Sequence, residues 1–398
     1  MNDRGKIVPM GGRRRAAPSA QHVAEFAEIA RRMREERDEA ANVVERVLRD
    51  TPVERWSELT DRAELRTCGA LEKLGAYAMQ LLGRDPGQAI IATRLAVTIC
   101  NSLTGYPPVV TAQLAAHAHK DLAKALLYLG RFDEALAALD DAEARVAPYG
   151  ALVHDLAIVH VVRATTLHEM NRYDEAFALL AACKDVFRDH RDNKRLLLCG
   201  ISEGVLLHRM RRYREAREAY LLLLPMAADL GDRDASACLH NVIGHCSVDL
   251  GDFAAAESYL TRAIELFHAL DQPLQAAKAD LGRGRMFVRR GDINRGIAHL
   301  RPIRADFMRH RMTEEAGLCG LEIVEALLLR GDASEAESLA RQIITEFSAA
   351  SLNTRAISAL GYLTEALAMR KASTEMVANV REYIVSLRTS PEREFAFA

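Results

Sequence analysis

Apolar residues recur at helical spacing along most of the chain, and the pattern itself returns about every 40 residues. A short signature marks each copy: a turn, an aromatic residue and then a Glu-Ala pair or its equivalent, as in Leu-Gly-Arg-Phe-Asp-Glu-Ala at 129–135. A fixed period of this size indicates stacked supersecondary units and not one globular core. The aromatic residue or its replacement falls at Phe132, Tyr173, Tyr213, Phe253, Ile293 and Ala333.

Each copy predicts two antiparallel helices joined by a tight turn. The Gly of the turn permits the left-handed conformation that ends a helix, and the aromatic residue anchors the second helix on the first. The last copy lacks the aromatic residue, so we expect it to close the stack as a terminal cap. The expected hairpins span residues 65–102, 110–147, 151–188, 193–229, 233–270, 273–309, 313–350 and 353–389.

Small residues recur inside the first helices, twelve positions before the Ala of the signature. Gly in a helix interior costs about 1 kcal/mol relative to Ala, so three of them at the spacing of the repeat indicate a place without room for a side chain. We expect each to face the Ala of the second helix. These positions are Ala123, Ala164, Gly204, Gly244 and Gly284.

This small–aromatic–Ala pattern resembles the tetratricopeptide repeat, in a variety with about 40 residues per repeat in place of the usual length of about 34. The best copy runs from 231 to 244 and continues at 250–256. The resemblance covers about 110–350 well and the two flanking hairpins loosely. It implies an all-α fold, a right-handed α-solenoid of stacked antiparallel helical hairpins, and it leaves the function open.

The N-terminal part departs from the repeat. Residues 1–18 are polar and basic, which predicts a disordered leader. Residues 19–64 are expected to form N-terminal capping helices over 20–49 and 52–62, with Trp56 near the junction. Two places stay open for the helix 20–49: a cap folded on the first repeats, or an occupant of the groove that the repeats form.

The solenoid is expected to span 65–389 and to end in a short tail, 390–398. Phe395 and Phe397 in this tail have no evident burial partner in the sequence. These rings could dock on a second copy of the chain, so a homodimer is one expectation.

The resemblance also implies where a partner would bind. In this family the groove positions lie one residue after the packing small residue, three before it and four after it. Carried onto this chain, they give a partner-binding groove of Lys120, Lys124, Thr165, His168, Val205, His208, Asn241, His245 and Arg285, with Ile201, Leu281 and Glu325 at equivalent positions.

The residue types in this groove suggest a partner. Asn241 and His245 are four residues apart and share one helix face, and an Asn amide can bind a peptide backbone by donating and accepting at once. Lys120, Lys124 and Arg285 favour an acidic peptide or helix, and the three histidines could add pH sensitivity. The alternative is that these residues are ordinary polar positions on a hydrated surface.

Composition argues against several other classes. The formal net charge is −2, which disfavours a protein that coats nucleic acid. No run of 18 apolar residues occurs, so no transmembrane helix is expected. Seven Cys without CxxC spacing indicate buried thiols in a reducing compartment, the cytoplasm.

Signals for chemistry are weak. Four metal-ligating side chains, Cys238, His240, His245 and Cys246, share one helix, and four ligands from one straight helix cannot surround zinc. Motifs of P-loop, hydrolase and zinc-protease type are missing from the sequence. We therefore expect no catalytic residue, no metal and no cofactor.

The sequence favours a non-enzymatic scaffold that binds a partner peptide or helix in the groove. The alternative is a bacterial regulator that responds to a ligand or peptide and acts on a transcriptional or signalling partner. An excess of Arg over Lys is typical of GC-rich bacterial genes, so it favours a bacterial source and gives no information on function.

Overall fold

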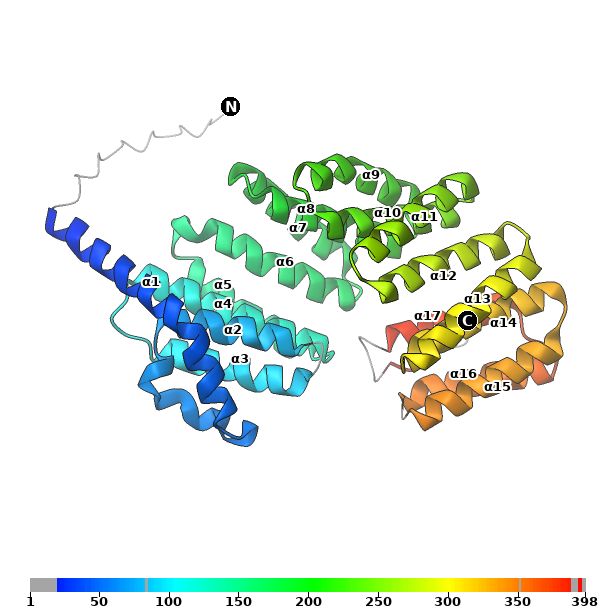
Figure 1. The fold of residues 1–398 in the computed structure, drawn as a ribbon, viewed down its shortest axis with the longest axis horizontal. Helices are drawn as coiled ribbons and strands as arrows, with labels where there is room; N and C mark the ends of the chain where they lie inside the picture. Colours follow the sequence, from blue (N-terminus) through cyan, green and yellow to red (C-terminus); the bar gives the residue numbers. More distant parts are fainter. Residues whose placement is uncertain (1–19, 83–84, 351, 388–392, 396–398) are drawn as a thin grey trace, which may run out of the picture. The chain divides into compact units, whose positions relative to one another are not determined.

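All regular structure in the described part of the chain is helical (Figure 1). It divides into two compact units, residues 1–118 and 119–398, while a boundary between residues 64 and 65 stays a prediction. The predicted basic leader, 1–18, lies outside the described residues. The computed structural model describes residues 20–82, 85–350, 352–387 and 393–395.

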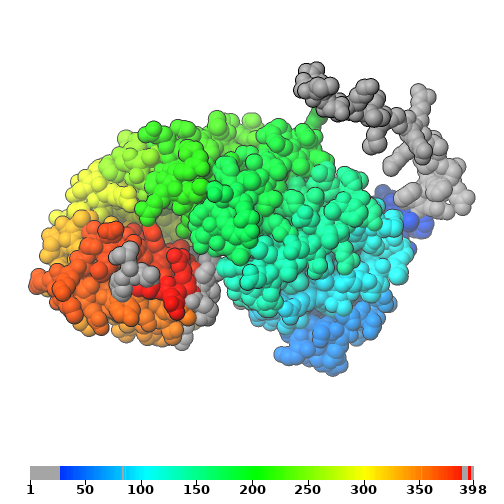
Figure 2. Space-filling model, turned by 180° about the vertical axis from the view of Figure 1, so that it is seen from behind, coloured from blue at the N-terminus to red at the C-terminus, as the bar shows by residue number. Residues whose placement is uncertain are grey.

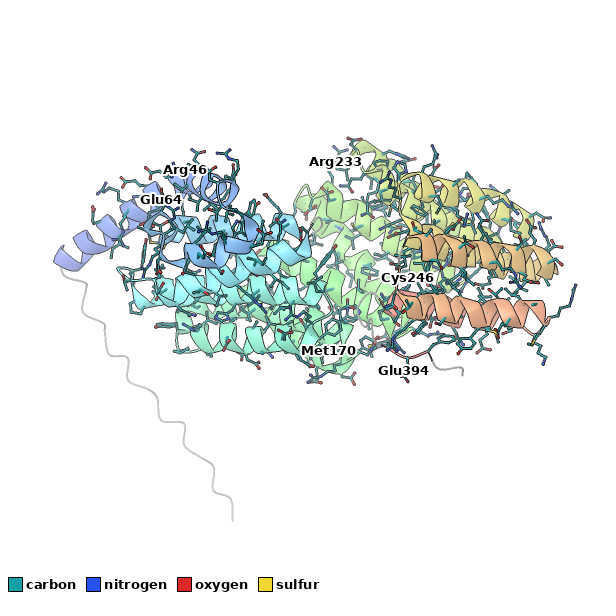
Figure 3. All side chains as sticks on the ribbon, turned by 90° about the horizontal axis from the view of Figure 1, so that it is seen from below. Arg46, Glu64, Met170, Arg233, Cys246 and Glu394 are labelled. Atoms are coloured by element: carbon teal, nitrogen blue, oxygen red, sulfur yellow. The ribbon has the colours of Figure 1, made fainter. Side chains whose placement is uncertain are left out.

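Unit 1 is built on a long first helix that packs along α2. The contact is close: a Cβ at Gly69 would lie 2.4 Å from the carbonyl oxygen of Glu36. Trp56 is buried, and Arg46 forms an ion pair with Glu64 at 2.8 Å (Figure 3). The elements are α1 (Ala20–Arg49), the 3-10 helices η1 (Val53–Asp61) and η2 (Ala63–Leu65), α2 (Cys68–Leu81), α3 (Pro86–Asn101) and α4 (Pro108–Tyr128), which continues into unit 2.

Unit 2 is a right-handed α-solenoid of antiparallel hairpins, in which each helix from α5 onward packs against the next one along the chain. From α6 to α13 every helix has 17 residues. The helices are α5 (Phe132–Val146), η3 (Gly150–Leu152), α6 (Val153–Glu169), α7 (Tyr173–Asp189), α8 (Asn193–Arg209), α9 (Tyr213–Asp229), α10 (Arg233–Asp249), α11 (Phe253–Ala269), α12 (Pro273–Arg289), α13 (Ile293–Arg309), α14 (Thr313–Arg330), α15 (Ala333–Ala349), α16 (Thr354–Ala368) and α17 (Thr374–Ser386).

From Asn171 to Gly331 the turns of unit 2 recur at one interval, which is half of the sequence repeat. Gly251 and Gly331 adopt the left-handed conformation that the turn requires, as the sequence predicts. Asn171 and Arg211 occupy the same place with φ of 60° and 58°, so a Gly is favoured there but not obligatory. Because turns within and between hairpins have the same length, the repeat consists of two nearly equal halves.

The small residues of the first helices lie at a close contact, as expected: a Cβ at Gly296, at the position of the signature Ala, would lie 3.3 Å from the carbonyl oxygen of Gly284. A larger side chain of the second helix also contacts the small residue. A Cβ at Gly204 would lie 2.2 Å from the Tyr220 ring, and one at Gly244 would lie 2.6 Å from Leu260. Each of these neighbours comes one helical turn after the Ala of the signature. The Ala permits the approach, and the larger side chain beyond it fills the space that the Gly leaves.

The last hairpin departs from the regular packing. Its second helix, α17, lies along α14 as well as against α16, and it buries Val377 and Ile384. Phe395 contacts Tyr383, with ring centroids 4.7 Å apart, so the expectation that this ring has no partner was wrong. Phe397 lies outside the described residues.

One described segment, 150–169, is long and apolar enough to cross a membrane by length and composition, which the sequence reading did not anticipate. It comprises η3 and α6, and 44% of it is buried inside the fold. Because α6 packs between α5 and α7, we interpret it as a core helix of the repeat.

Two helix glycines provide a matched test of the close contact. Gly204→Ala should lower the melting temperature, because the added Cβ meets the fully buried Tyr220 ring and overpacking costs about 1–3 kcal/mol. Gly361→Ala in α16 should raise it, since nothing lies within 4 Å and Ala is the better helix former by about 1 kcal/mol. Thermal unfolding followed by circular dichroism measures both, and shifts of the same sign would contradict the close-contact interpretation.

Candidate partner-binding site

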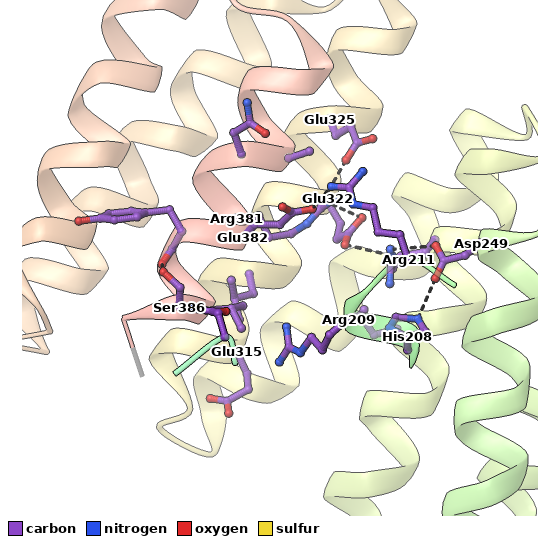
Figure 4. A pocket seen from close by; sticks show the side chains of 18 of the residues that line it. His208, Arg209, Arg211, Asp249, Glu315, Glu322, Glu325, Arg381, Glu382 and Ser386 are labelled. Carbon is purple, nitrogen blue, oxygen red and sulfur yellow. Dashed lines mark hydrogen bonds and ion pairs between the residues drawn. The ribbon is translucent and has the colours of Figure 1, made fainter. Parts of the chain in front are cut away.

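Unit 2 contains a cavity of about 890 Å³ (Figure 4). Its walls are formed by the first helices of five consecutive hairpins, α6, α8, α10, α12 and α14, which we call the inner helices, and by α17. Three residues of the predicted groove line it: His168, His208 and Arg285. Leu281 and Glu325, at equivalent positions, line it as well.

The other predicted residues lie away from this cavity. Lys120 forms an ion pair with Asp121 at 2.6 Å. The Oδ1 atom of Asn241 is buried, and His245 packs against α12, where a Cβ at Gly282 would lie 2.7 Å from its ring. The residues outside the lining are Lys120 and Lys124 on α4, Thr165 on α6, Val205 on α8, and Asn241 and His245 on α10.

A chain of ion pairs crosses the cavity wall from one inner helix to the next. His208 Nε2 lies 3.0 Å from Asp249 Oδ2, and Arg285 bridges Asp249 at 3.9 Å and Glu322 at 3.1 Å. Arg381 of α17 then meets Glu322 at 3.1 Å. We call these five residues the ionic ladder; it joins α8, α10, α12, α14 and α17 (Figure 4).

The ladder keeps the Asp249 carboxylate ionised although it is largely buried. Burial alone would raise the pKa of Asp249, but the hydrogen bond from His208 and the charges of Arg285 and Arg289 outweigh it and hold that pKa below its usual range. The Glu322 carboxylate raises the pKa of Arg285 further above its ordinary value. The cavity therefore presents fixed charges of both signs.

Burial lowers the pKa of two histidines of the predicted groove. Burial, reinforced by the charge of Arg209, lowers the pKa of His168 to about 4. Burial and the charge of Arg285 lower the pKa of His245 to about 4 as well. Both rings are therefore neutral at pH 7 and add no positive charge to the groove.

Sequence reasoning missed a second charged position, the last residue of the first four inner helices, α6, α8, α10 and α12. Glu169, Arg209, Asp249 and Arg289 all line the cavity, and they follow one another at the interval of the repeat with alternating sign. That spacing is visible in the sequence and could have revealed them. The contribution of Arg381 could not be found in this way, because α17 does not follow the repeat.

The described residues contain no group of three or more His, Cys, Asp or Glu side chains placed to hold a metal ion. The four residues that the sequence brings together on α10 include Cys238, which is exposed, and Cys246, which is buried.

The neutral state of His245 predicts a stability that depends on pH. The unfolded chain binds a proton near pH 6.5 and the folded chain only near pH 4, so stability is full above pH 6.5 and is lost as the pH falls below it. Protonation of this ring in the unfolded chain should lower the free energy of unfolding by about 2 kcal/mol between pH 7 and pH 5. Urea unfolding of the wild type and of His245→Gln across this range measures it.

The variant should lose less stability on acidification than the wild type. At pH 8 neither state binds the proton, so the difference between the two proteins there reports packing alone. Parallel pH profiles for the two proteins would contradict the neutral, buried histidine.

Comparison with known proteins gives the repeat a family. The family model for the tetratricopeptide repeat matches residues 239–267, from α10 into α11. No curated protein matches the chain in sequence.

Solved structures share the fold at low sequence identity. Aspartyl phosphate phosphatase F from Bacillus subtilis aligns with a TM-score of 0.57 and 9% identity over 70% of each chain. A signal transduction ATPase with a tetratricopeptide repeat sensor, from Pyrococcus horikoshii, aligns with a TM-score of 0.57 and 14% identity. That match covers 90% of this chain and 53% of the other, so this chain spans about half the length of that protein.

These likenesses concern the fold, because identities this low carry no information on activity. The matched segment overlaps the best copy of the repeat signature, and the same helix pairing extends on both sides of it. The chain therefore contains a tetratricopeptide repeat, within a stack of hairpins that share its helix pairing.

Proposed function

We propose that unit 2 is a non-enzymatic scaffold that binds a peptide or helix of a partner protein across its inner helices. The observation that carries this proposal is the cavity, whose lining residues come from five consecutive hairpins. A segment that lies over it touches several repeats at once, so many small contacts add up to one binding site. Its volume of about 890 Å³ accommodates a few side chains of such a segment.

The charges favour a partner that carries both signs. The expectation of an acidic partner depended on Lys120, Lys124 and Arg285, yet the two lysines lie outside the cavity and Arg285 is paired with Glu322. Basic side chains line the cavity from α8 and α12, and carboxylates line it from α14. We therefore propose a zwitterionic segment in place of an acidic one.

A catalytic role is left out of the proposal. One structural neighbour is named a phosphatase and another an ATPase, but those activities belong to those proteins. In this chain the buried carboxylates of Asp249 and Glu322 are held by arginines, an arrangement that fixes charge and does not activate a nucleophile. Metal, cofactor, nucleic acid and membrane have no part in the proposal either.

The second candidate function is a bacterial regulator that responds to a peptide or small ligand. One observation favours it: a ligand in the cavity would bridge inner helices that belong to different hairpins, so it could change how those hairpins stack. Such a protein would pass the change to a transcriptional or signalling partner.

We place the protein in the cytoplasm. Cys246 and Cys319 are free thiols, and burial raises the pKa of each to about 12, so they serve packing and not disulfide chemistry. A homodimer through the C-terminal tail also stays a prediction, and it would require Phe395 to leave Tyr383.

Charge reversal at the cavity rim tests the scaffold. Arg209→Glu with Lys278→Glu should reduce capture of the partner from the native cell at least about tenfold, because like charges then face the segment. The matched control, Arg188→Glu with Arg262→Glu, makes the same charge change on α7 and α11. Affinity purification followed by mass spectrometry compares the two.

Equal capture by the cavity variant and the control, both with wild-type circular dichroism, would overturn the scaffold proposal. Small-angle scattering separates the second candidate function from the first. A regulator should change its radius of gyration when the captured segment is added, whereas a rigid scaffold should keep it.

A further inference from the structure

The C-terminal helix occupies the place where a partner would bind. In the preceding hairpins of unit 2 the second helix packs behind the first one, and no more than three residues separate the two. Five residues separate α17 from α16, and α17 starts at Thr374 in place of an aromatic residue and lies along the inner helix α14 (Figure 1). The longer turn allows α17 to pack along α14 and not only behind α16.

Two adjacent residues of α17 contact opposite charges. Arg381 Nη1 lies 2.9 Å from Glu325 Oε2 and 3.1 Å from Glu322 Oε2, both on α14. Glu382 accepts a hydrogen bond at 3.0 Å from Arg211, in the turn after α8. In Figure 2 the red surface at the C-terminal end of unit 2 adjoins green surface from the middle of the chain. One basic residue and the acidic residue after it on α17 therefore form ion pairs with carboxylates and with an arginine of the cavity.

An apolar face completes the contact. Val377, Val380, Tyr383 and Ile384 are buried, and all four belong to the same hydrophobic cluster as α14 and α16. Relative to Arg381 they stand at positions −4, −1, +2 and +3, one face of a helix. Helix α17 thus has the features of an amphipathic ligand that lies in a groove.

Release of α17 costs Glu325 its ion pair with Arg381, but the Glu325 side chain is 22% exposed and can be hydrated. Glu322 keeps Arg285 at 3.1 Å when Arg381 departs. The Arg211–Glu382 pair is 71% and 63% exposed, and such pairs contribute little. With 13 residues, α17 is also too short to be a stable helix on its own. The apolar face and the ion pairs of Arg381 hold it in place, and an incoming helix with the same pattern can replace both.

We infer that α17 is a displaceable internal ligand, and that the partner is a helix with the same pattern: a basic residue followed by an acidic one, with apolar residues at −4, −1, +2 and +3. This inference rests on the proposed function and specifies the chemistry of its partner. Binding of the partner then requires α17 to leave the inner helices.

The experiment uses the full-length chain and a fluorescent synthetic peptide with the sequence of residues 371–387. The variant Arg381→Ala with Glu382→Ala weakens the internal helix, so it should bind the peptide at least tenfold more tightly than the wild type does. Glu337→Ala with Arg341→Ala removes an ion pair of α15 and serves as the matched control, with wild-type affinity. Fluorescence anisotropy measures all three.

A second peptide tests the charge pattern. With Arg381→Glu and Glu382→Arg in the peptide, affinity for the weakened chain should fall at least tenfold. Excess of the unaltered peptide should also speed hydrogen exchange of residues 374–386 in the wild-type chain, because it displaces them. Equal affinity of the wild type and the weakened chain, equal affinity of the two peptides, or no peptide binding would overturn the inference.

The outcome is independent of partner capture. If capture depends on the cavity rim but the peptide does not bind, the scaffold proposal is supported and the inference about α17 is wrong. If the peptide binds as expected but the rim variant and its control on α7 and α11 capture the same proteins, the scaffold proposal is wrong while the inference about α17 is supported.

Discussion

The structure depends on one geometric constraint, the constant step along the chain from the start of one helix to the start of the next. A 17-residue helix and a three-residue turn bring the chain back to an equivalent place each time. Close contact at Gly204 and its equivalents sets the distance between the two helices of a hairpin. All helices from α6 to α13 have the same length. The side chains at one position of the repeat therefore lie on the same wall, and together they form a continuous surface.

This constraint explains which features could be read from the sequence. The signature at Phe132, Tyr173, Tyr213 and Phe253 locates the start of each second helix, because an anchor must recur wherever the hairpin recurs. The glycines were identified for the right steric reason, and the Tyr220 ring, which the sequence analysis did not name, is the nearest neighbour of Gly204. Periodic features are predictable because each copy of the repeat forms the same helices, turn and close contact.

The site was only partly predictable, and the failures have physical causes. Of the predicted groove residues, His168, His208 and Arg285 line the cavity. Positions carried over from the family placed Asn241 and His245 in the same groove, but in this chain His245 turns toward Gly282, where the next helix passes close by. The position of α17 depends on a single irregular turn and on contacts with residues up to 171 positions away, which no local pattern encodes.

The alternation of sign along the inner helices has a consequence for register. Glu169, Arg209, Asp249 and Arg289 give the wall an electrostatic period of two hairpins, twice the structural one. A bound helix that slid by one hairpin would find the same shape but the opposite charges. By shape alone a repetitive surface would accept a segment at every hairpin, whereas the alternating charges restrict the proposed segment to places two hairpins apart.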